Sequence, residues 1–528
     1  MGYVSEWLVE LSAHNGSAVV PLRYSGSGYV TGPSDSPANT IFDARIAREA
    51  GIGVFSRQLF GDGRTMGHAT IEPGALVLSN ADRGLDALKG YAFDGRSFKL
   101  MRLSHPRAAY SSAEVMLTGT MDGIDTGEGS LTIRIPFYDR RRDIDIPIQS
   151  EKYAGTTTSA GATAEGSADM KDQVKPLIFG RCYSVPATIV NDFNMFLQFS
   201  ASAVNSITLY DGGVPLINDG DVANLSALAS ATGNPGHYRT CLAQGIARPF
   251  GTFNGRPAFT WTADVVEGSS AAQRRAGAIV QRMLAKIRIT GSSNIDSASF
   301  SALDSLATAE LGIYLDRETT VLSAAYEILR SVGGFIIPNN LGRFTVGRLD
   351  EPGTPIMTIT EPEILTGSAT ETPAFMPNPD TDGAVPANSV LIKWRKNWHT
   401  HTDSDLGHCA NFGDPTRGNA LKQEWREVRE ESSAVAARHL LSRELEIETM
   451  LVDQSAAEAE AARRLNLYSV NRDVVRIGYP ISEADSLQLN ETVELVLDRF
   501  DYTNGKAMRI IGRADDFANE KTILTLWG

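Results

Sequence analysis

Short runs of alternating apolar and polar residues, separated by turn residues, recur along most of this chain. Successive side chains of a strand point to opposite faces, so such runs predict strands that are buried on one side. Clear examples are KLMRLSHP, AEVMLTGTMDGI and GSLTIRIPFYD in the first 150 residues, with DTGEG as a hairpin loop, and SITLYDGGVPLI around an Asp-Gly-Gly turn. Four more runs follow near the end: DVVRIGYPI, ETVELVLDRF, KAMRIIGRAD and KTILTLWG. The pattern predicts a β-rich α+β protein.

The final run carries apolar side chains as far as Trp527. Chain ends usually fray into polar tails, whereas an alternating run predicts a paired strand. We expect Ile523, Thr525 and Trp527 on one face and Leu524 and Leu526 on the other. Trp527 is then predicted to anchor a core.

Three- and four-residue spacing of apolar residues predicts helices between these strands. One helix has Ala276, Ile279, Val280, Met283, Leu284 and Ile287 on one face, with Ser270 and Gln273 as a capping box. Two more are expected near 300–311 and 319–332, followed by a hairpin in FIIPNNLGRFTVGRL. A later helix has Ser455 and Glu458 as its box, and Ala459, Ala462 and Leu465 as a packing face.

The chain has 528 residues, which is too long for one hydrophobic core and predicts roughly three or four domains. The changes in composition predict these segments: 1–150, β-rich; 151–175, a flexible linker or loop of Gly, Ala, Ser and Thr; 176–268, β-rich; 269–350, α/β; 351–430, irregular with a strand near 389–398; 431–528, a helix followed by strands. Between Ala154 and Gln173 the segment holds only small and polar side chains apart from Met170, so it cannot bury enough apolar area to fold alone.

Forty-nine basic and sixty-three acidic residues give a net charge of −14, which disfavours an outward nucleic-acid-binding surface. The three cysteines, Cys182, Cys241 and Cys409, form no CxxC pair, so we expect folding in a reducing cytoplasm. The sequence contains no apolar run of about 18 residues and no evident export signal, so no stable membrane insertion is expected.

The strongest candidate site is WHTHTDSDLGHC, which contains His399, His401, His408, Cys409 and the acids Asp403 and Asp405. Imidazole and thiolate suit zinc, but the spacing matches no established zinc motif, and the segment is also typical of a solvated loop after a strand. We favour the loop and predict no metal.

Other candidates are weaker. Asp211, Asp219 and Asp221 lack the ligand order of a calcium loop and are typical of turns. The segment SGSGYVTGPSDS lacks the Gly-Lys-Ser/Thr of a phosphate-binding loop, and no GxSxG, HExxH or catalytic-cysteine signature occurs. We therefore predict no catalytic, cofactor-binding or metal-binding residues, no cofactor and no enzymatic activity.

Four stretches, in order between residues 130 and 528, resemble the tail-tip or baseplate hub proteins of tailed bacteriophages and gene-transfer particles. They are LTIRIPFYDRRRDIDIPIQSEKYAG followed by KPLIFGRCYSVPATIVN; SITLYDGGVPLI; GTFNGRPAFTWTADVVEGSS leading into a helix; and SAAEAEAARRLNLYSVNRD with the closing AMRIIGRADDFANEKTILTLWG.

The resemblance implies a structural virion protein, folded in the host bacterial cytoplasm and located at the distal tail tip. Such hubs are homotrimers with two similar β-barrel, tube-like domains per subunit. They contact the distal tail protein, the tape-measure protein and tip or fibre proteins, and genomic DNA passes through them during ejection into the host without specific binding. Some carry an iron–sulfur cluster on four cysteines, a feature that three scattered cysteines do not support.

Two other functions stay open at the sequence level. A tail-associated hydrolase of cell wall or glycans would use the dispersed carboxylates or the segment from His399 to Cys409. A receptor-binding tip protein would show repeats or a long fibrous segment, and the sequence shows neither.

Overall fold

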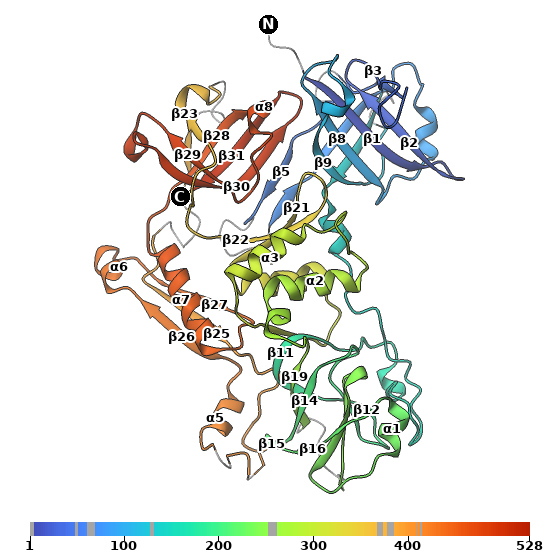
Figure 1. Cartoon of the computed structure of the whole chain (residues 1–528), viewed down its shortest axis with the longest axis vertical. Helices are drawn as coiled ribbons and strands as arrows, with labels where there is room; N and C mark the ends of the chain where they lie inside the picture. Colours follow the sequence, from blue (N-terminus) through green and yellow to red (C-terminus); the bar gives the residue numbers. More distant parts are fainter. Residues whose placement is uncertain are drawn as a thin grey trace.

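The computed structural model describes residues 5–47, 51–60, 69–126, 131–251, 261–366, 373–376, 385–407, 409–411 and 414–528. The chain is elongated (Figure 1), with the first and last sheets at one end, helices in the middle and two smaller sheets at the other end. The prediction of a β-rich, multidomain α+β fold is confirmed. In the part of the chain that the structure describes, no helix has the length and apolar character needed to cross a bilayer.

An eight-stranded sheet with the order β3-β4-β2-β1-β8-β9-β10-β7 dominates the N-terminal region. The predicted runs form β8, β9 and β10, and Phe98 stacks on Phe137 in the core beneath them, with ring centroids 4.2 Å apart. Part of the predicted DTGEG loop, residues 127–129, lies outside the described residues. The strands are β1 (Glu6–His14), β2 (Val19–Ser25), β3 (Tyr29–Val30), β4 (Ile41–Ala44), β7 (Gly74–Ser79), β8 (Ser97–Leu103), β9 (Glu114–Met121) and β10 (Thr132–Tyr138).

Two five-stranded sheets form the opposite end, with the orders β15-β14-β19-β11-β20 and β12-β13-β18-β17-β16. The predicted Asp-Gly-Gly turn joins β14 to β15, and Gly212 and Gly213 there have φ of 54° and 77°. Glycine adopts this conformation without strain. The elements are β11 (Leu177–Pro186), β12 (Thr188–Asn191), β13 (Phe196–Gln198), β14 (Ser206–Asp211), β15 (Val214–Pro215), β16 (Ile217–Asp221), α1 (Leu225–Ser230), β17 (His237–Cys241), β18 (Ile246–Pro249), β19 (Trp261–Val266) and β20 (Gly312–Leu315).

Segment 151–175, predicted as a linker or mobile loop, packs against the second of these sheets. Asn191 donates through Nδ2 to the carbonyls of Gly161 and Thr163, and Gly166 N–H donates to the carbonyl of Val190. Buried Tyr153 donates its hydroxyl to Gln198 at 2.6 Å. The segment cannot form a core of its own, but neighbouring strands supply the hydrogen-bond partners and the apolar contacts.

The middle layer contains α2 (Ala276–Lys286), α3 (Ser297–Leu306), α4 (Val321–Arg330) and the hairpin β21 (Gly334–Pro338) with β22 (Phe344–Arg348), so these predicted elements are confirmed. The capping box of Ser270 and Gln273 is wrong. Ser270 precedes a separate 3-10 helix, Ala271–Arg274, and its side chain makes no capping bond. Asp304 instead accepts from the first amides of α2, Gly277 and Ala278, at 2.7 and 3.0 Å. A cap supplied by another helix leaves no local sequence signal.

A three-stranded sheet, β26-β25-β27, carries helix α7 on its side. The expected strand near 389–398 is β25, and α7 confirms the later helix, but its predicted face is wrong because Ala459 and Ala462 are exposed. The buried face holds Glu460 and Arg464, paired at 2.6 Å. The elements are β25 (Ser389–Trp394), α5 (Arg417–Lys422), β26 (Arg426–Glu431), α6 (Ser433–Arg438), β27 (Glu444–Glu448) and α7 (Gln454–Tyr468).

The box predicted for α7 is also wrong. Asp453 occupies the N-cap position, Ser455 is exposed, and Glu458 accepts a hydrogen bond from the side chain of Gln454 at 2.8 Å.

The last sheet has the order β23-β29-β30-β31-β28-β24. The final strand, β31, pairs with β28 on one side and β30 on the other, and Trp527 is fully buried, so the predicted paired strand and core anchor are confirmed. The elements are β23 (Thr358–Thr360), β24 (Ala374–Met376), β28 (Val474–Pro480), α8 (Ile481–Ala484), β29 (Thr492–Val496), β30 (Lys506–Asp516) and β31 (Lys521–Trp527).

Strand β5 (Phe55–Gln58) pairs with β30 and with β6 (Thr70–Glu72), so segment 1–150 contributes strands to both large sheets. Contacts between Trp7 and Phe517 and an ion pair of Arg102 with Asp485 join the two sheets further. Within the described ranges neither sheet closes on itself as a barrel.

Candidate functional site

The segment that follows β25 lies beside the end of β11, where Asn397 forms a bridge with Tyr183. His399 N–H donates to the carbonyl of Ser184, and the Ser184 hydroxyl donates to the carbonyl of His399, each at 2.8 Å. Asn397 donates through Nδ2 to the carbonyls of Ala420 and Gln423, each at 2.7 Å. The segment is therefore fixed to the sheet below it and to the chain that follows it.

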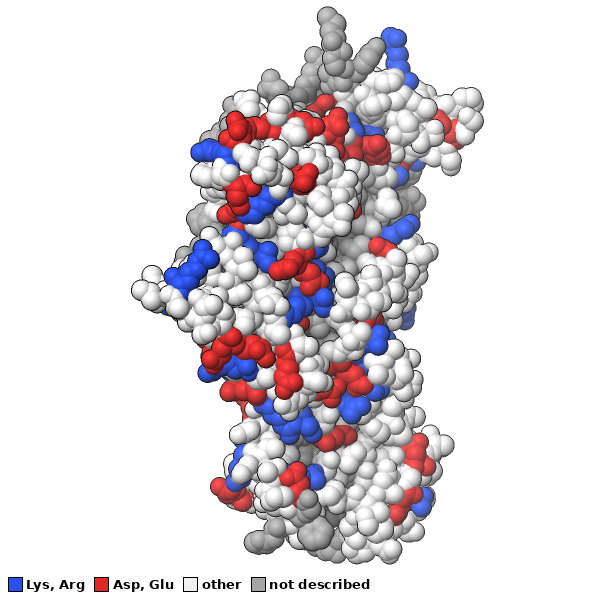
Figure 2. Space-filling model, turned by 60° about the vertical axis from the view of Figure 1, so that its left-hand side comes forward, with Lys and Arg blue, Asp and Glu red and all other residues white. Residues whose placement is uncertain are grey.

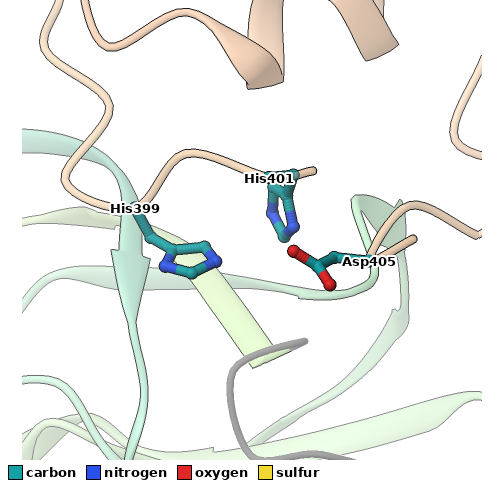
Figure 3. A group of neighbouring side chains, drawn as sticks. All are labelled: His399, His401 and Asp405. Atoms are coloured by element: carbon teal, nitrogen blue, oxygen red, sulfur yellow. The ribbon is translucent and has the colours of Figure 1, made fainter. Parts of the chain in front are cut away.

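Three of the six candidate residues come together here. The side chains of His399, His401 and Asp405 lie close together (Figure 3), and their ligand atoms are all within 4.8 Å of one another. Of the other three, Asp403 is exposed and pairs with Lys422, Cys409 is exposed, and His408 lies outside the described residues.

The expectation of a solvated loop is wrong for His401, whose side chain belongs to a residue only 3% exposed. Burial lowers the pKa of His401 to about 4, with a further contribution from His399, whose own pKa is lowered by burial. Both imidazoles are therefore neutral near pH 7. Nδ1 of His401 and Nε2 of His399 are buried and make no hydrogen bond to the described residues.

Asp405, in contrast, is already engaged in its own turn. Its carboxylate accepts from the amide and hydroxyl of Thr402 at 3.0 and 2.7 Å, and these bonds lower the pKa of Asp405. The cluster thus offers two free imidazole nitrogens and a carboxylate that closes a turn. Our prediction for this cluster remains that it binds no metal.

The weaker candidates have local roles. The carboxylate of Asp219 lies 2.8 Å from Nδ1 of His237. The carboxylate of Asp221 accepts from the Thr240 hydroxyl and the Leu242 amide. In the glycine-rich stretch, the amides of Gly26 and Ser27 donate to Glu6, so a carboxylate of the chain already occupies the position that a phosphate would need.

A pocket beside the histidine cluster was not predicted. It has a volume of about 700 Å³ and shares Thr262, which lies 3.4 Å from Nε2 of His401, with the cluster. Its lining includes Arg395, Arg417 and Arg426. The alternation of the sequence identifies strands, but it gives no sign that three arginines from separate elements converge on one pocket.

No protein-family model matches this sequence, and no curated protein is similar to it. Among solved structures, the chain is similar to a tail protein from Neisseria meningitidis MC58, at 9% identity over 98% of this chain and 96% of that one, with a TM-score of 0.40. It is similar to a chain of the virion of a native gene transfer agent, at 12% identity over 71% and 87%, TM-score 0.41. It is also similar to the 43 kDa tail protein of prophage MuSo2 from Shewanella oneidensis, at 10% identity over 99% and 96%, TM-score 0.38.

Proposed function

We propose that the chain is a structural virion protein, the hub that closes the distal end of a phage-type tail tube and connects it to tip or fibre proteins. The observation that carries this proposal is the convergence of the stretches that resemble hub proteins. SITLYDGGVPLI contributes β14, KPLIFGRCYSVPATIVN contributes β11, and TWTADVVEG contributes β19. In the structure, β19 pairs with β14 and β11 in one sheet.

The last stretch that resembles hub proteins also forms neighbouring strands of one sheet. AMRIIGRADDFANEKTILTLWG forms the paired strands β30 and β31, and β30 also pairs with β5 from the N-terminal segment. We propose that the two eight-stranded sheets correspond to the two tube-like domains of each subunit, and that three subunits complete the ring around the tail axis. A ring of identical subunits uses head-to-tail contacts.

The proposed partners follow from this position. They are two further copies of the chain, the distal tail protein, the tape-measure protein, and tip or fibre proteins. Figure 2 shows acidic and basic side chains mixed in small groups over one face. We propose that the wall facing the channel is net acidic, because a basic wall would hold the passing genome through phosphate contacts.

Cryo-electron microscopy of assembled tails tests the proposal. We expect three copies of the chain at the distal end, with a channel wall poor in Lys and Arg. Six copies, one copy, or a location away from the tip would contradict it. Cell-wall digestion by the purified chain would favour the hydrolase alternative, and direct binding to host cells would favour the receptor-binding alternative.

A further inference from the structure

The pocket next to the histidine cluster brings together residues that are far apart along the chain. Its lining comes from β11, β14, β19, the end of β25, described residues between Asn397 and Arg426, and the start of α7. Three arginines enter it from different elements. Arg395 directly follows β25, Arg417 begins α5, and Arg426 begins β26.

Each of these guanidinium groups lies over an aromatic ring. The Arg395 group is 4.1 Å from the ring centroid of Tyr183, the Arg417 group is 4.6 Å from that of Tyr210, and the Arg426 group is 5.6 Å from that of Trp394. Stacking of this kind restricts the side chain and leaves the edge of the guanidinium plane, which carries its N–H donors, available. Stacking on these rings therefore helps to hold each arginine in place.

None of the three arginines forms an ion pair with any residue that the structure describes. Some other half-buried or buried arginines of the chain are paired with carboxylates. Arg274 pairs with Glu310 at 2.8 Å, and Arg282 pairs with Glu267 at 2.7 Å. Arg248, which has no such pair among the described residues, donates instead to three backbone carbonyls. The pocket thus gathers three partly buried arginines without a direct ion pair.

The two carboxylates of the lining lie near these arginines, and each accepts hydrogen bonds from other groups. Asp264 accepts from the Ser184 amide and the Tyr210 hydroxyl, each at 3.0 Å. Exposed Asp414 accepts from the amide and hydroxyl of Thr416. Nε of Arg395 and Nε1 of Trp394 are buried and have no hydrogen-bond partner among the described residues. Burial lowers the pKa of Arg426, and the positive charge of Arg395 lowers it further. These two arginines therefore repel each other.

We propose that this pocket binds an acidic segment of a partner protein, whose carboxylate side chains pair with Arg395, Arg417 and Arg426. Guanidinium groups bind carboxylates through paired, charge-assisted hydrogen bonds, and a bound carboxylate would also relieve the repulsion between Arg395 and Arg426. The lining holds three arginines and only two carboxylates, which are already hydrogen-bonded. The pocket therefore has an excess of positive charge, which a short segment with a few carboxylates would neutralise.

The net charge of −14 argues against a nucleic acid as the occupant, because a nucleic acid would bring a continuous row of phosphates over an acidic protein. A partner whose negative charge is concentrated in one segment avoids most of this repulsion. The proposal does not depend on the tail-tip position, since the pocket lies within one chain.

Titration calorimetry of the purified full chain with a hexaglutamate peptide at low salt tests the proposal. We expect binding that weakens as salt increases. The variant Arg395→Gln/Arg426→Gln should bind roughly tenfold more weakly or worse, because each change removes a charged hydrogen bond. Arg317→Gln, a change at an exposed arginine outside the pocket, should bind like the parent. Circular dichroism confirms that each variant is folded.

The thermal midpoint separates binding from a structural role. Because Arg426 has no ion pair among the described residues and is repelled by Arg395, Arg426→Gln should lower peptide affinity without lowering the midpoint. Equal peptide binding by parent and double variant would overturn the proposal, as would the absence of binding. Tighter binding of a ten-nucleotide oligothymidylate would assign the pocket to phosphate, and a parent dimer in sedimentation that the double variant loses would assign it to a second copy. These outcomes are independent of tail imaging.

Discussion

The C-terminal sheet and the arginine pocket both place arginines beside carboxylates, with opposite results. In the sheet, buried Asp515 accepts from Arg513 at 2.7 Å and from the Thr522 hydroxyl at 2.6 Å, and it lies 3.7 Å from Arg57 of β5. In the pocket, the described arginines and carboxylates form no ion pairs. A buried charge needs a partner, so the first arrangement joins strands of the fold, whereas the second is suited to an external anion.

The largest expected effect comes from removing most of β31, which lies beside β30 in the C-terminal sheet. A chain ending at Ile523 loses Leu524, Leu526 and Trp527, all fully buried, together with ladder bonds to β28 and β30. Each such side chain stabilises by roughly 1.5–3 kcal/mol, against a typical domain stability of about 5–15 kcal/mol. We expect loss of the C-terminal fold and of tail assembly, measured by thermal melting and particle infectivity.

Removal of Gly528 alone is the control for this truncation. Gly528 exchanges two backbone hydrogen bonds with Asp473, at 2.8 and 3.1 Å. We therefore expect a small loss of about 1–2 kcal/mol with assembly retained. A cooperative melt at the parent temperature for the chain ending at Ile523 would show that β31 is dispensable.

The second prediction removes the carboxylate that pairs with Arg57 and Arg513 in the C-terminal sheet. Asp515→Ala leaves Arg57 and Arg513 buried without their carboxylate and should cost about 3–5 kcal/mol in the free energy of unfolding. Asp501→Ala, which removes an exposed partner of Lys506, should cost less than about 1 kcal/mol. Urea unfolding measures both. Similar costs for the two variants would mean that burial and pairing do not distinguish the regions.

Much of the fold could be predicted from the sequence because the spacing of apolar residues along the chain indicates strands and helices. The runs that become β8, β14, β30 and β31 have their side-chain faces encoded in consecutive residues. The errors arise where a partner comes from far along the chain. Asp304 caps α2 from α3, Asn191 holds the loop around Gly161, and β5 joins β30 across more than four hundred residues.

The candidate site follows the same rule. His399, His401 and Asp405 lie close together in sequence and could be named, but the burial of His401 depends on the sheet beneath it. The three pocket arginines come from separate elements and have no shared local pattern.

A smaller effect should appear in the pH dependence of stability. His401 has its pKa lowered to about 4 from its usual 6.5, so the unfolded chain takes up a proton first as the pH falls. Stability attributable to this neutral histidine is present above pH 6.5 and decreases as the pH falls toward 4. Between pH 7 and 5 the parent should lose about 1–2 kcal/mol more than His401→Gln. Urea unfolding at both pH values measures the difference, with His439→Gln as the control. Equal pH slopes for parent and His401→Gln would contradict the assigned burial.

The smallest expected effect is that of metal ions on the histidine cluster. Zinc commonly binds neutral imidazole nitrogens, which His399 and His401 provide, and orienting partners normally fix such ligands. Here Asp405 is held by Thr402, and the only hydrogen-bond partner of a ring nitrogen within the described cluster is the Thr262 hydroxyl, 3.4 Å from His401. We therefore expect no stoichiometric zinc or iron by elemental analysis after dialysis, and no change in the thermal midpoint on adding zinc or a chelator. About one metal ion per chain, lost in His401→Ala but kept in His439→Ala, would show instead that the unpartnered nitrogens of this region, like the unpaired arginines beside them, form a binding site.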